Sequence, residues 1–257
     1  MAQGTNTYLV GSGQKRLLID AGEGHVPEYT LNLKKALESE RCSLTDLVIT
    51  HWHHDHVGGV QDVVQLAGCE DDVRVHKFPR PEDDMIPGVR VSELTDRQQI
   101  CVEGATCEVL HTPGHTTDHV VLYLREENAV FSADCILGEG TAVFESLYHY
   151  MQSLEKILEI QPSIIYPGHG PVIEDPVEKI QYYIKHRLAR EEQIFSCLLS
   201  FGQDGMDSMG IVKHVYKDTP SNLHIAANVN VQHHLEKLET ERKVVRTGSM
   251  WKVWKFV

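Results

Sequence analysis

The chain has 257 residues, of which 41% are hydrophobic, and a formal net charge of −13. This length fits one large domain, or a large and a small one, and the acidic charge argues against nonspecific nucleic-acid binding over the whole surface. The sequence holds no apolar run of about 18 residues, so we expect no transmembrane helix and no membrane partner. Six cysteines without a C-x-x-C pair are typical of reduced thiols in an intracellular protein.

Residues 1–170 combine short β-type runs with a few helical stretches. Apolar runs rich in β-branched residues and bounded by Gly, Pro and Asp predict strands. The predicted strands are Tyr8–Val10, Leu17–Asp20, Leu47–Thr50, Val73–Phe78, Ile100–Val102, Thr106–His111, His119–Leu124, Ala129–Ala133 and Ile164–Tyr166. The predicted helices are Pro27–Glu40, Val60–Ala67 and Leu147–Ile160. Many strands mixed with helices favour a layered α/β domain, which we assign to residues 1–175.

A different pattern begins at Pro176. Apolar residues recur there at three- and four-residue steps, which is typical of amphipathic helices. The predicted helices span Val177–Leu198, Met209–Tyr216 and Leu223–Leu238, and the predicted strands Lys243–Thr247 and Met250–Val257 follow. The two-residue loop between these strands, Gly248-Ser249, is typical of a hairpin with a type II′ turn. Three helices followed by a hairpin favour a small winged-helix-like domain at residues 176–257.

Charge is distributed unevenly between these two regions. Residues 1–175 carry 12 Lys and Arg against 28 Asp and Glu, a net of −16, whereas residues 176–257 carry 12 against 9, a net of +3. Two domains with unrelated surfaces would explain this difference, and so would a C-terminal face for an anionic partner. On the predicted hairpin, Trp251 and Trp254 could stack on bases, although we favour a role in packing the hairpin on its helices.

Seven potential metal ligands, all imidazoles or carboxylates, lie just past the ends of four predicted strands. They are His51, His53, Asp55, His56, His115, Asp134 and His169. The first four follow Leu47–Thr50 on what we expect to be a loop, and Gly58-Gly59 permits tight turns or close packing there. Loops at one edge of a rigid sheet can bring such side chains together. Because imidazole with carboxylate suits zinc and similar metals, we expect a two-metal site.

These ligands divide into two sets. We assign His51, His53 and His115 to one metal ion and Asp55, His56 and His169 to the other, with Asp134 as the bridge between both. Asp20, at the end of a predicted strand, is a candidate for the carboxylate that accepts the second N–H of a metal-bound imidazole, or else a turn residue. His119, four residues past His115, could act as a general acid, although we favour a role in ordering its loop.

The pattern His51-x-His53-x-Asp55-His56, followed in order by His115, Asp134 and His169, resembles the metallo-β-lactamase superfamily. This resemblance covers residues 4–172 and implies an α/β fold, a four-layer αββα sandwich with two metal ions at one edge of the sheets. Three further runs resemble the animal β-lactamase-like 2 family within it. They are Gly4–Gly11, Asp134–Thr141 and Ile165–Val172. The winged-helix interpretation of the C-terminal region fits that family too.

The activity that this resemblance implies is metal-dependent endonucleolytic cleavage of single-stranded RNA, with two Zn²⁺ ions, in the mitochondrial matrix. A hydroxide shared by the metal ions is the expected nucleophile, and Asp55 and Asp134 are the carboxylates expected to take part in catalysis. We expect the weakly basic region after Pro176 to hold the RNA, with Lys252 and Lys255 as candidate contacts. The sequence indicates no protein partner.

Two other functions stay open. The same hydroxide would attack a carbonyl as readily as phosphorus, so the first alternative is a thioesterase or related acyl hydrolase, which suits the acidic catalytic region. The second is a non-catalytic nucleic-acid-binding protein with a structural metal, against which the complete ligand set argues. Only 34 residues separate Asp134 from His169, too few for the inserted domain of the β-CASP nucleases, and His53 stands where flavodiiron proteins have glutamate.

The start of the chain departs from the family pattern. Family members carry a strand and a loop ahead of Gly4, where this sequence has Met1–Gln3, so we expect the first hairpin to lack its partner strand. Met1–Val10 shows the features of neither a signal peptide nor a transit peptide. The cytoplasm is therefore the alternative to the mitochondrial matrix.

Overall fold

The computed structural model describes residues 4–66, 73–80 and 86–256. Its internal contacts divide the chain into two compact units. The first unit comprises Met1–Glu145 and Gln152–Ile180, and the second comprises Ser146–Met151 and Gln181–Val257. Within the described residues, no helix combines the length and the apolar character needed to cross a membrane.

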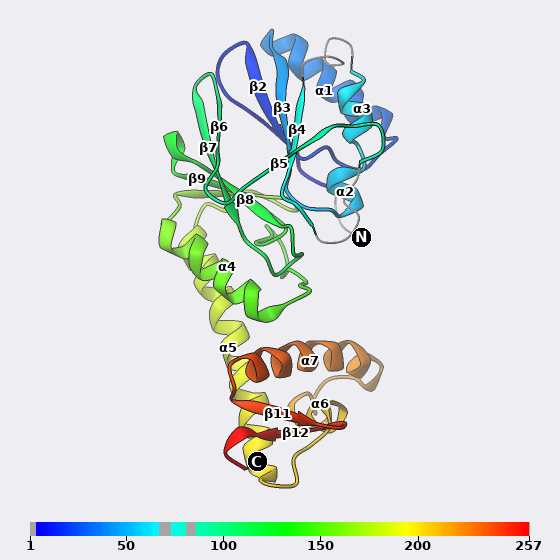
Figure 1. Cartoon of the computed structure of the whole chain (residues 1–257), viewed down its shortest axis with the longest axis vertical. Coiled ribbons are helices and arrows are strands. Elements are labelled where there is room, and N and C mark those ends of the chain that lie inside the picture. Colours follow the sequence, from blue (N-terminus) through cyan, green and yellow to red (C-terminus); the bar gives the residue numbers. More distant parts are fainter. Residues whose placement is uncertain (1–3, 67–72, 81–85, 257) are drawn as a thin grey trace. The chain divides into compact units, whose positions relative to one another are not determined.

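Five strands form the first sheet of the first unit, in the order β1-β2-β3-β4-β5 (Figure 1). They are β1 (Tyr8–Val10), β2 (Lys15–Ile19), β3 (Ser43–Ile49), β4 (Arg74–Lys77) and β5 (Val91–Glu93). β1 runs antiparallel to β2, and the other neighbours are parallel. Four of these strands match predicted ones within a few residues, whereas β5 was missed, because Val91-Ser92-Glu93 contains no apolar run.

The second sheet also has five strands, in the order β10-β9-β8-β7-β6. They are β6 (Gln99–Val102), β7 (Ala105–His111), β8 (Val120–Leu124), β9 (Ala129–Ala133) and β10 (Ile164–Pro167). Only β9 and β10 are parallel, and the other pairs are antiparallel. All five strands were predicted. β7, β8 and β9 are mostly buried apolar runs, whereas β6 and β10 are short and only partly buried.

Four α-helices accompany these sheets: α1 (Pro27–Glu40), α2 (His54–Val57), α3 (Val60–Val64) and α4 (Leu147–Ile160). The predictions for α1 and α4 are confirmed to the residue. The helix predicted to run to Ala67 ends at Val64, and Ala67 itself lies outside the described residues. The single-turn helix α2 was not predicted, because one turn is too short to show a period.

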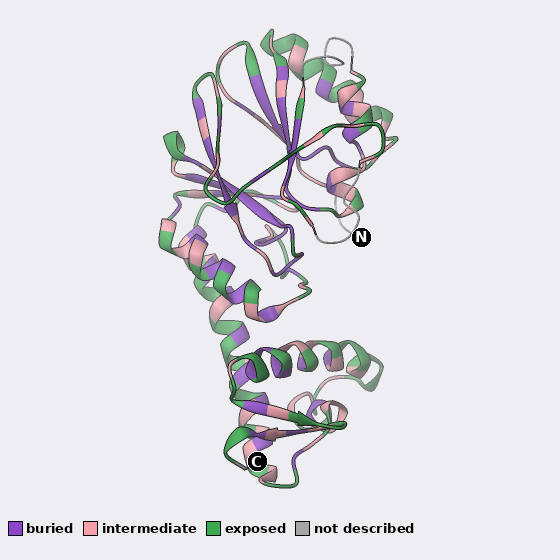
Figure 2. Ribbon diagram, viewed as in Figure 1, coloured by how far each residue is buried: buried purple, intermediate pink, exposed green. Residues whose placement is uncertain are grey.

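An apolar core lies on each face of the first sheet, and buried residues run along the strands in Figure 2. On one face, Leu33 of α1 and Val63 of α3 pack with Leu47 of β3. On the other face, Leu17 of β2 and Leu122 of β8 belong to a core that joins the two sheets. Three layers, helix on sheet on sheet, follow from these two cores.

α4 supplies the fourth layer. From Gln152 onward this helix belongs to the first unit, and its Leu154 and Ile157 are fully buried. The Ser153 hydroxyl donates a hydrogen bond to the Pro113 carbonyl just past β7, at 2.7 Å. The predicted four-layer αββα sandwich is confirmed.

The second unit contains most of α5 (Pro176–Phe201), with α6 (Ser208–Val215), α7 (His224–Thr240) and the hairpin β11 (Val244–Thr247) and β12 (Met250–Val253). Leu198, Val231 and Trp251 belong to one buried core that draws on these helices and the hairpin. Gly248 has a φ of +62° and Ser249 is not among the residues with positive φ, as a type II′ turn requires. The predicted winged-helix-like arrangement is therefore confirmed.

Candidate metal centre

The segment His51–His56 spans the end of β3 and the single turn of α2. His51 and His53 lie in the connection, whereas Asp55 and His56 lie on α2. The expectation that the whole segment is a loop is therefore wrong for its second half. The close packing predicted at Gly58-Gly59 is confirmed. A Cβ atom on Gly59 would lie 2.1 Å from the Ala21 carbonyl oxygen, so no larger residue fits there.

Three imidazole nitrogens converge in the first ligand set. The Nε2 atom of His51 lies 3.1 Å from Nδ1 of His53 and 3.3 Å from Nε2 of His115. The distance from Nε2 of His115 to Nδ1 of His53 is 3.0 Å. His51 and His115 are buried and His53 is half-buried. Three nitrogen lone pairs that face one point form a set that a cation can occupy.

Outer contacts fix which ring nitrogen faces this point. The Thr50 hydroxyl donates to Oδ2 of Asp20 at 2.9 Å, so it accepts the Nδ1–H of His51, which lies 3.0 Å away. The Nδ1–H of His115 donates to the Val143 carbonyl at 2.8 Å. In both rings the Nε2 lone pair is consequently left to face the ligand set.

The second ligand set consists of Asp55, His56 and His169. Oδ2 of Asp55 lies 3.2 Å from Nε2 of His169 and 3.6 Å from Nε2 of His56. The Nδ1–H of His56 donates to Oδ2 of Asp20 at 2.8 Å, and Oδ1 of Asp20 accepts the Thr50 backbone N–H at 2.8 Å. Asp20 therefore lies where the sequence predicted an orienting carboxylate. It contacts His56 of the second set directly and is linked to His51 of the first set through Thr50.

Asp134 lies between the two sets. Its Oδ1 is 3.3 Å from Nε2 of His56 and 3.4 Å from Nε2 of His169, and its Oδ2 is 3.6 Å from Nε2 of His115. The preceding residue, Ala133, has a left-handed backbone with a φ of 43°, which is costly for alanine and turns the chain at the end of β9. The structure thus brings all seven predicted ligands together, with the predicted bridge in the middle.

The turn that carries His169 needs glycine for a steric reason. A Cβ atom on Gly168 would lie 2.5 Å from Oδ1 of Asp134 and 3.0 Å from Cε1 of His56. The backbone of this turn therefore approaches the bridge carboxylate more closely than any side chain would allow.

The unpaired polar atoms of the centre fit a pair of cations. Among the described residues, Nε2 of His56 and Oδ1 of Asp134 are buried and have no hydrogen-bond partner. Buried polar atoms without partners are rare in folded proteins, and a bound ion can satisfy them. Five imidazoles and two carboxylates in two touching sets therefore form a candidate di-metal site.

Protons compete with metal ions for this centre. Burial opposes a charged imidazole, but the carboxylates of Asp20 and Asp134 outweigh it and raise the pKa of metal-free His56 to about 10. The carboxylates of Asp134 and Asp55 raise the pKa of His169 to about 10 as well. Metal uptake at neutral pH must therefore displace these protons, so metal affinity should fall as the pH falls, by about tenfold per pH unit for each proton displaced. Competition titrations with a chromophoric chelator at pH 6, 7 and 8 would measure this dependence, and a pH-independent affinity would contradict it.

His119 is held by two contacts inside the fold. Its Nε2 accepts the Asp134 backbone N–H at 3.3 Å, so Nδ1 carries the proton and faces the Thr112 hydroxyl at 2.9 Å. The ring is fully buried, and burial holds its pKa well below the usual range. This geometry favours the ordering role over that of a general acid, because no titrating proton faces the ligand sets.

Two residues at the start of the chain contact the centre, although the sequence suggested no role for them. The Thr5 hydroxyl donates to Oδ2 of Asp55 at 2.9 Å. The Asn6 amide donates to the carbonyls of Pro167, at 3.0 Å, and Gly170, at 2.9 Å, which flank His169. Both residues belong to the run Gly4–Gly11 that carried the family resemblance, and this was the one signal that pointed to them.

The predicted RNA contacts lie on the second unit. Lys252 is half-buried on β12, and Lys255 is exposed just after that strand. Trp251 is buried in the core of this unit, which confirms its packing role, whereas Trp254 is exposed. The described cysteines are all free thiols, as predicted, and none of them belongs to a ligand set.

Replacing Asp20 by asparagine should weaken metal binding by about 10- to 100-fold, because the carboxylate holds His56 directly and His51 through Thr50. Metal affinity would be measured by chelator competition. Asp46→Asn is the matched control, since Asp46 is an equally buried carboxylate that binds His76 at 2.8 Å and belongs to neither ligand set. Equal losses of metal affinity in the two variants would contradict the orienting role.

Two packed sheets that carry this His–Asp cluster at their strand ends define an αββα hydrolase with a candidate di-metal site. The chain belongs to the metallo-β-lactamase superfamily, whose family pattern matches residues 2–169. Residues 208–254 match the beta-lactamase associated winged helix domain. The resemblance to the superfamily and the winged-helix interpretation are thereby confirmed.

Relatives of known name extend this assignment. The chain is 52% identical over 247 residues to a beta-lactamase-like protein 2 homolog of Drosophila melanogaster, which covers 94% of this chain and 84% of the relative. A homolog of the same name in Caenorhabditis elegans is 45% identical over 236 residues, or 92% of this chain and 79% of the relative. An atrochrysone carboxyl ACP thioesterase of Aspergillus fumigatus is 41% identical over 200 residues, or 76% of this chain and 60% of the relative.

Solved structures agree on the fold. A beta-lactamase domain protein from Burkholderia ambifaria superimposes with a TM-score of 0.78 at 17% identity, over 97% of this chain and 87% of that one. The protein TTHA1623, solved in a di-iron-bound form, superimposes with a TM-score of 0.54 at 27% identity, over 69% of this chain and 95% of that one. Similar folds therefore include a di-iron protein, so the fold does not specify the metal.

Proposed function

We propose that this protein is a zinc-dependent endoribonuclease that hydrolyses phosphodiester bonds of single-stranded RNA. The observation that carries the proposal is the position of Asp134 between two ligand sets, in a chain that also contains a winged-helix domain. Zinc suits the donors, because imidazole nitrogen and carboxylate oxygen are among its usual ligands.

The residues of the centre support hydrolysis. Two zinc ions, when bound, would lower the pKa of water and neutralise charge on phosphate oxygens. Asp20, Thr50 and the Val143 carbonyl hold three of the imidazoles in one tautomer. The Thr5 hydroxyl and the His119 ring hold Asp55 and the backbone of Asp134. Reacting groups in such a preorganised site need little rearrangement during the reaction.

The charge of the C-terminal region supports RNA as substrate. Residues 176–257 have a net charge of +3 in a chain whose remainder has a net of −16. Lys252 and Lys255 lie on the hairpin or just after it, and the hairpin is the wing of the winged-helix domain. Phosphate contacts from such lysines would hold a strand without reading its sequence.

A direct comparison of substrates tests the proposal. The zinc-loaded protein would be assayed with a fluorescent single-stranded RNA, a duplex RNA of the same sequence and a panel of acyl thioesters. We expect multiple turnovers on the single strand, with internal cleavage products. Thioester hydrolysis without RNA cleavage would overturn the proposal.

Acyl-thioester hydrolysis is the second candidate. The observation that favours it is the 41% identity to a fungal thioesterase over 200 residues. The two-metal chemistry would be the same, with a carbonyl in place of phosphorus. The acidic charge of residues 1–175 also suits an uncharged carbonyl better than a polyanion.

Reversing the charges of Lys252 and Lys255 to glutamate should weaken single-stranded RNA binding several-fold. It should also lower the slope of log affinity against log salt by about 0.7 for each phosphate that a lysine no longer neutralises. Fluorescence anisotropy at several salt concentrations would measure both effects. Lys34→Glu with Lys35→Glu on α1 is the matched control, because both lysines are exposed on the first unit. Identical salt slopes in the two double variants would contradict the prediction.

The proposal extends to location. We propose that the protein acts in the mitochondrial matrix, as the family resemblance implies, with the cytoplasm as the alternative. Immunoblotting of protease-treated mitochondria and of cytosol from the native source would decide between them. Protein found only in the cytosolic fraction would overturn the matrix location.

A further inference from the structure

Trp52 is an exposed aromatic residue inside the ligand segment. Its neighbour in sequence, His51, is fully buried, whereas Trp52 is 41% exposed. The indole contacts the ring of His53 edge-on, with 4.8 Å between the ring centroids. Any group that stacks on this indole would therefore lie beside the first ligand set.

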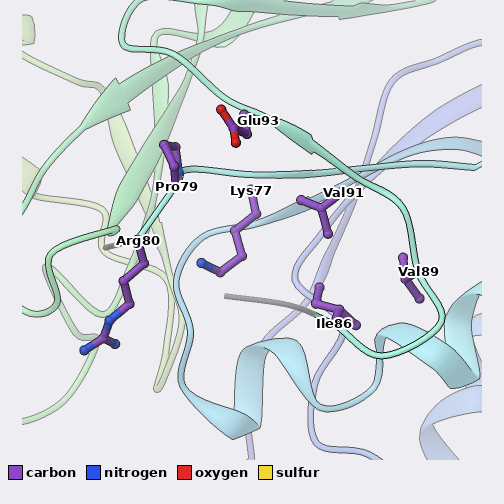
Figure 3. A pocket seen from close by; sticks show the side chains of 7 residues that line it. All are labelled: Lys77, Pro79, Arg80, Ile86, Val89, Val91 and Glu93. Carbon is purple, nitrogen blue, oxygen red and sulfur yellow. The ribbon is translucent and has the colours of Figure 1, made fainter. Parts of the chain in front are cut away.

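The indole is held in place by a charged side chain. The guanidinium carbon of Arg80 lies 4.4 Å from the centroid of the Trp52 ring. Arg80 and Glu93 both line a cavity of about 330 Å³. Figure 3 shows the Arg80 guanidinium directed away from Glu93. Arg80 is only 14% exposed despite its charge. A cation over an aromatic face is attracted to the ring, and this attraction stabilises the observed orientation of the indole.

Glu145 completes this support. Its Oε1 lies 3.6 Å from Nη2 of Arg80, and its backbone N–H donates to the Gly114 carbonyl at 2.8 Å. The chain of contacts from Trp52 through Arg80 to Glu145 therefore joins the connection after β3 to the loop that carries His115. The indole is thus fixed relative to two of the loops that supply the first ligand set.

Electrostatics favour stacking over ion pairing at this position. Residues 1–175 have a net charge of −16, so this region as a whole attracts a polyanion weakly, although the Arg80 guanidinium lies at the indole. Base stacking on an aromatic ring needs no positive charge and tolerates every base. A nucleobase is planar, and the Trp52 ring contacts His53 of the first ligand set, where the scissile phosphate would bind.

We propose that the face of Trp52 opposite Arg80 is the stacking platform for the nucleobase that flanks the scissile phosphate on the side of His51, His53 and His115. Arg80 and Glu145 are positioning residues that hold the indole. This inference rests on the proposed endoribonuclease function and adds the residue that favours a nucleotide over an acyl substrate.

The test pairs protein variants with abasic substrates. A short single-stranded RNA with one mapped cleavage site would be made with an abasic ribose at each position that flanks the cleaved bond. Trp52→Leu removes the aromatic face but keeps an apolar side chain, Trp52→Phe keeps a smaller face, and Leu31→Ala is the control at an exposed apolar residue of α1. Metal content and thermal midpoint would be measured for every variant.

Trp52→Leu should raise KM for intact RNA by about 5- to 100-fold, with a smaller rise for Trp52→Phe. An abasic ribose at one flanking position should cost the wild type a similar factor and cost Trp52→Leu nothing further. If the loss caused by the abasic ribose and the loss caused by Trp52→Leu multiply at every flanking position, the stacking role is wrong. The endoribonuclease proposal would then stand unchanged. A wild type that cleaves thioesters but no RNA would instead overturn both. If Trp52→Leu loses metal, Trp52→Phe takes its place. The stacking role then requires that the abasic ribose slow cleavage by Trp52→Phe less than it slows cleavage by the wild type.

Discussion

Replacing Asp134 by asparagine is expected to reduce hydrolysis by about three orders of magnitude or more while RNA binding is retained. The Asp134 carboxylate faces both ligand sets, with one oxygen near His56 and His169 and the other near His115. An amide has no net charge, and its nitrogen cannot act as a ligand. The variant would thus lose the anionic bridge between two cations, whose charge stabilisation amounts to several kcal/mol.

This loss should be specific to the centre. Turnover of single-stranded RNA, RNA affinity and metal content would be measured together for Asp134→Asn. Glu159→Gln on α4 is the matched control, because it neutralises an exposed carboxylate outside both ligand sets. Wild-type turnover by Asp134→Asn would show that the metal assignment is wrong. Loss of RNA affinity equal to the loss of turnover would show that Asp134 acts in folding rather than at the centre.

Removing the metal ions should abolish turnover and lower thermal stability. The ligands come from separate strand ends, so bound cations join segments that are far apart in sequence. Metal present at 1,000 times its dissociation constant would stabilise the native state by roughly 4 kcal/mol. For a chain of this size that corresponds to a shift of the thermal midpoint of order 10 °C.

The metal-free protein is nevertheless expected to remain folded. Without cations, His56 and His169 carry protons that compensate Asp55 and Asp134, whose pKa values are held below their usual range. Chelation followed by dialysis, calorimetry and stepwise addition of Zn²⁺, Mn²⁺ or Fe²⁺ would test both statements. Recovery with Zn²⁺ at two equivalents would support the zinc centre, whereas full activity in protein stripped of metal would exclude it.

Much of the fold could be predicted because apolar periodicity is a local property. α1 and α4 were predicted to the residue, and β9 likewise. α4 and β9 carry buried apolar residues between clear boundaries, whereas α1 buries only Leu33 and is marked by Pro27 in its first turn. The missed elements were the short ones. β5 has three residues with two of them exposed, and α2 has a single turn, so neither shows a period.

The orientation of the seven candidate ligands depends on contacts between segments that lie far apart in sequence. The tautomers of His51 and His115 depend on Thr50 and on the Val143 carbonyl, and the contact of Thr5 with Asp55 spans 50 residues. The stacking of Arg80 on Trp52 was likewise invisible in sequence. Such contacts join residues of different loops, so they depend on how the loops are oriented in the folded chain. A local sequence pattern does not predict that orientation.

The identity of the side chains that could bind metal was evident from the amino-acid sequence. Imidazoles and carboxylates just past the ends of β3, β7, β9 and β10 are chemical identities at strand ends, and strand ends follow from local apolar runs. The packing of two sheets then decided which nitrogen of His51, His56 and His115 faces the ligand sets. It also placed Asp134 between the two sets and the His119 ring against the backbone of Asp134. Direction and distance between distant segments arise only when the cores between the layers close, because buried polar atoms must then find partners.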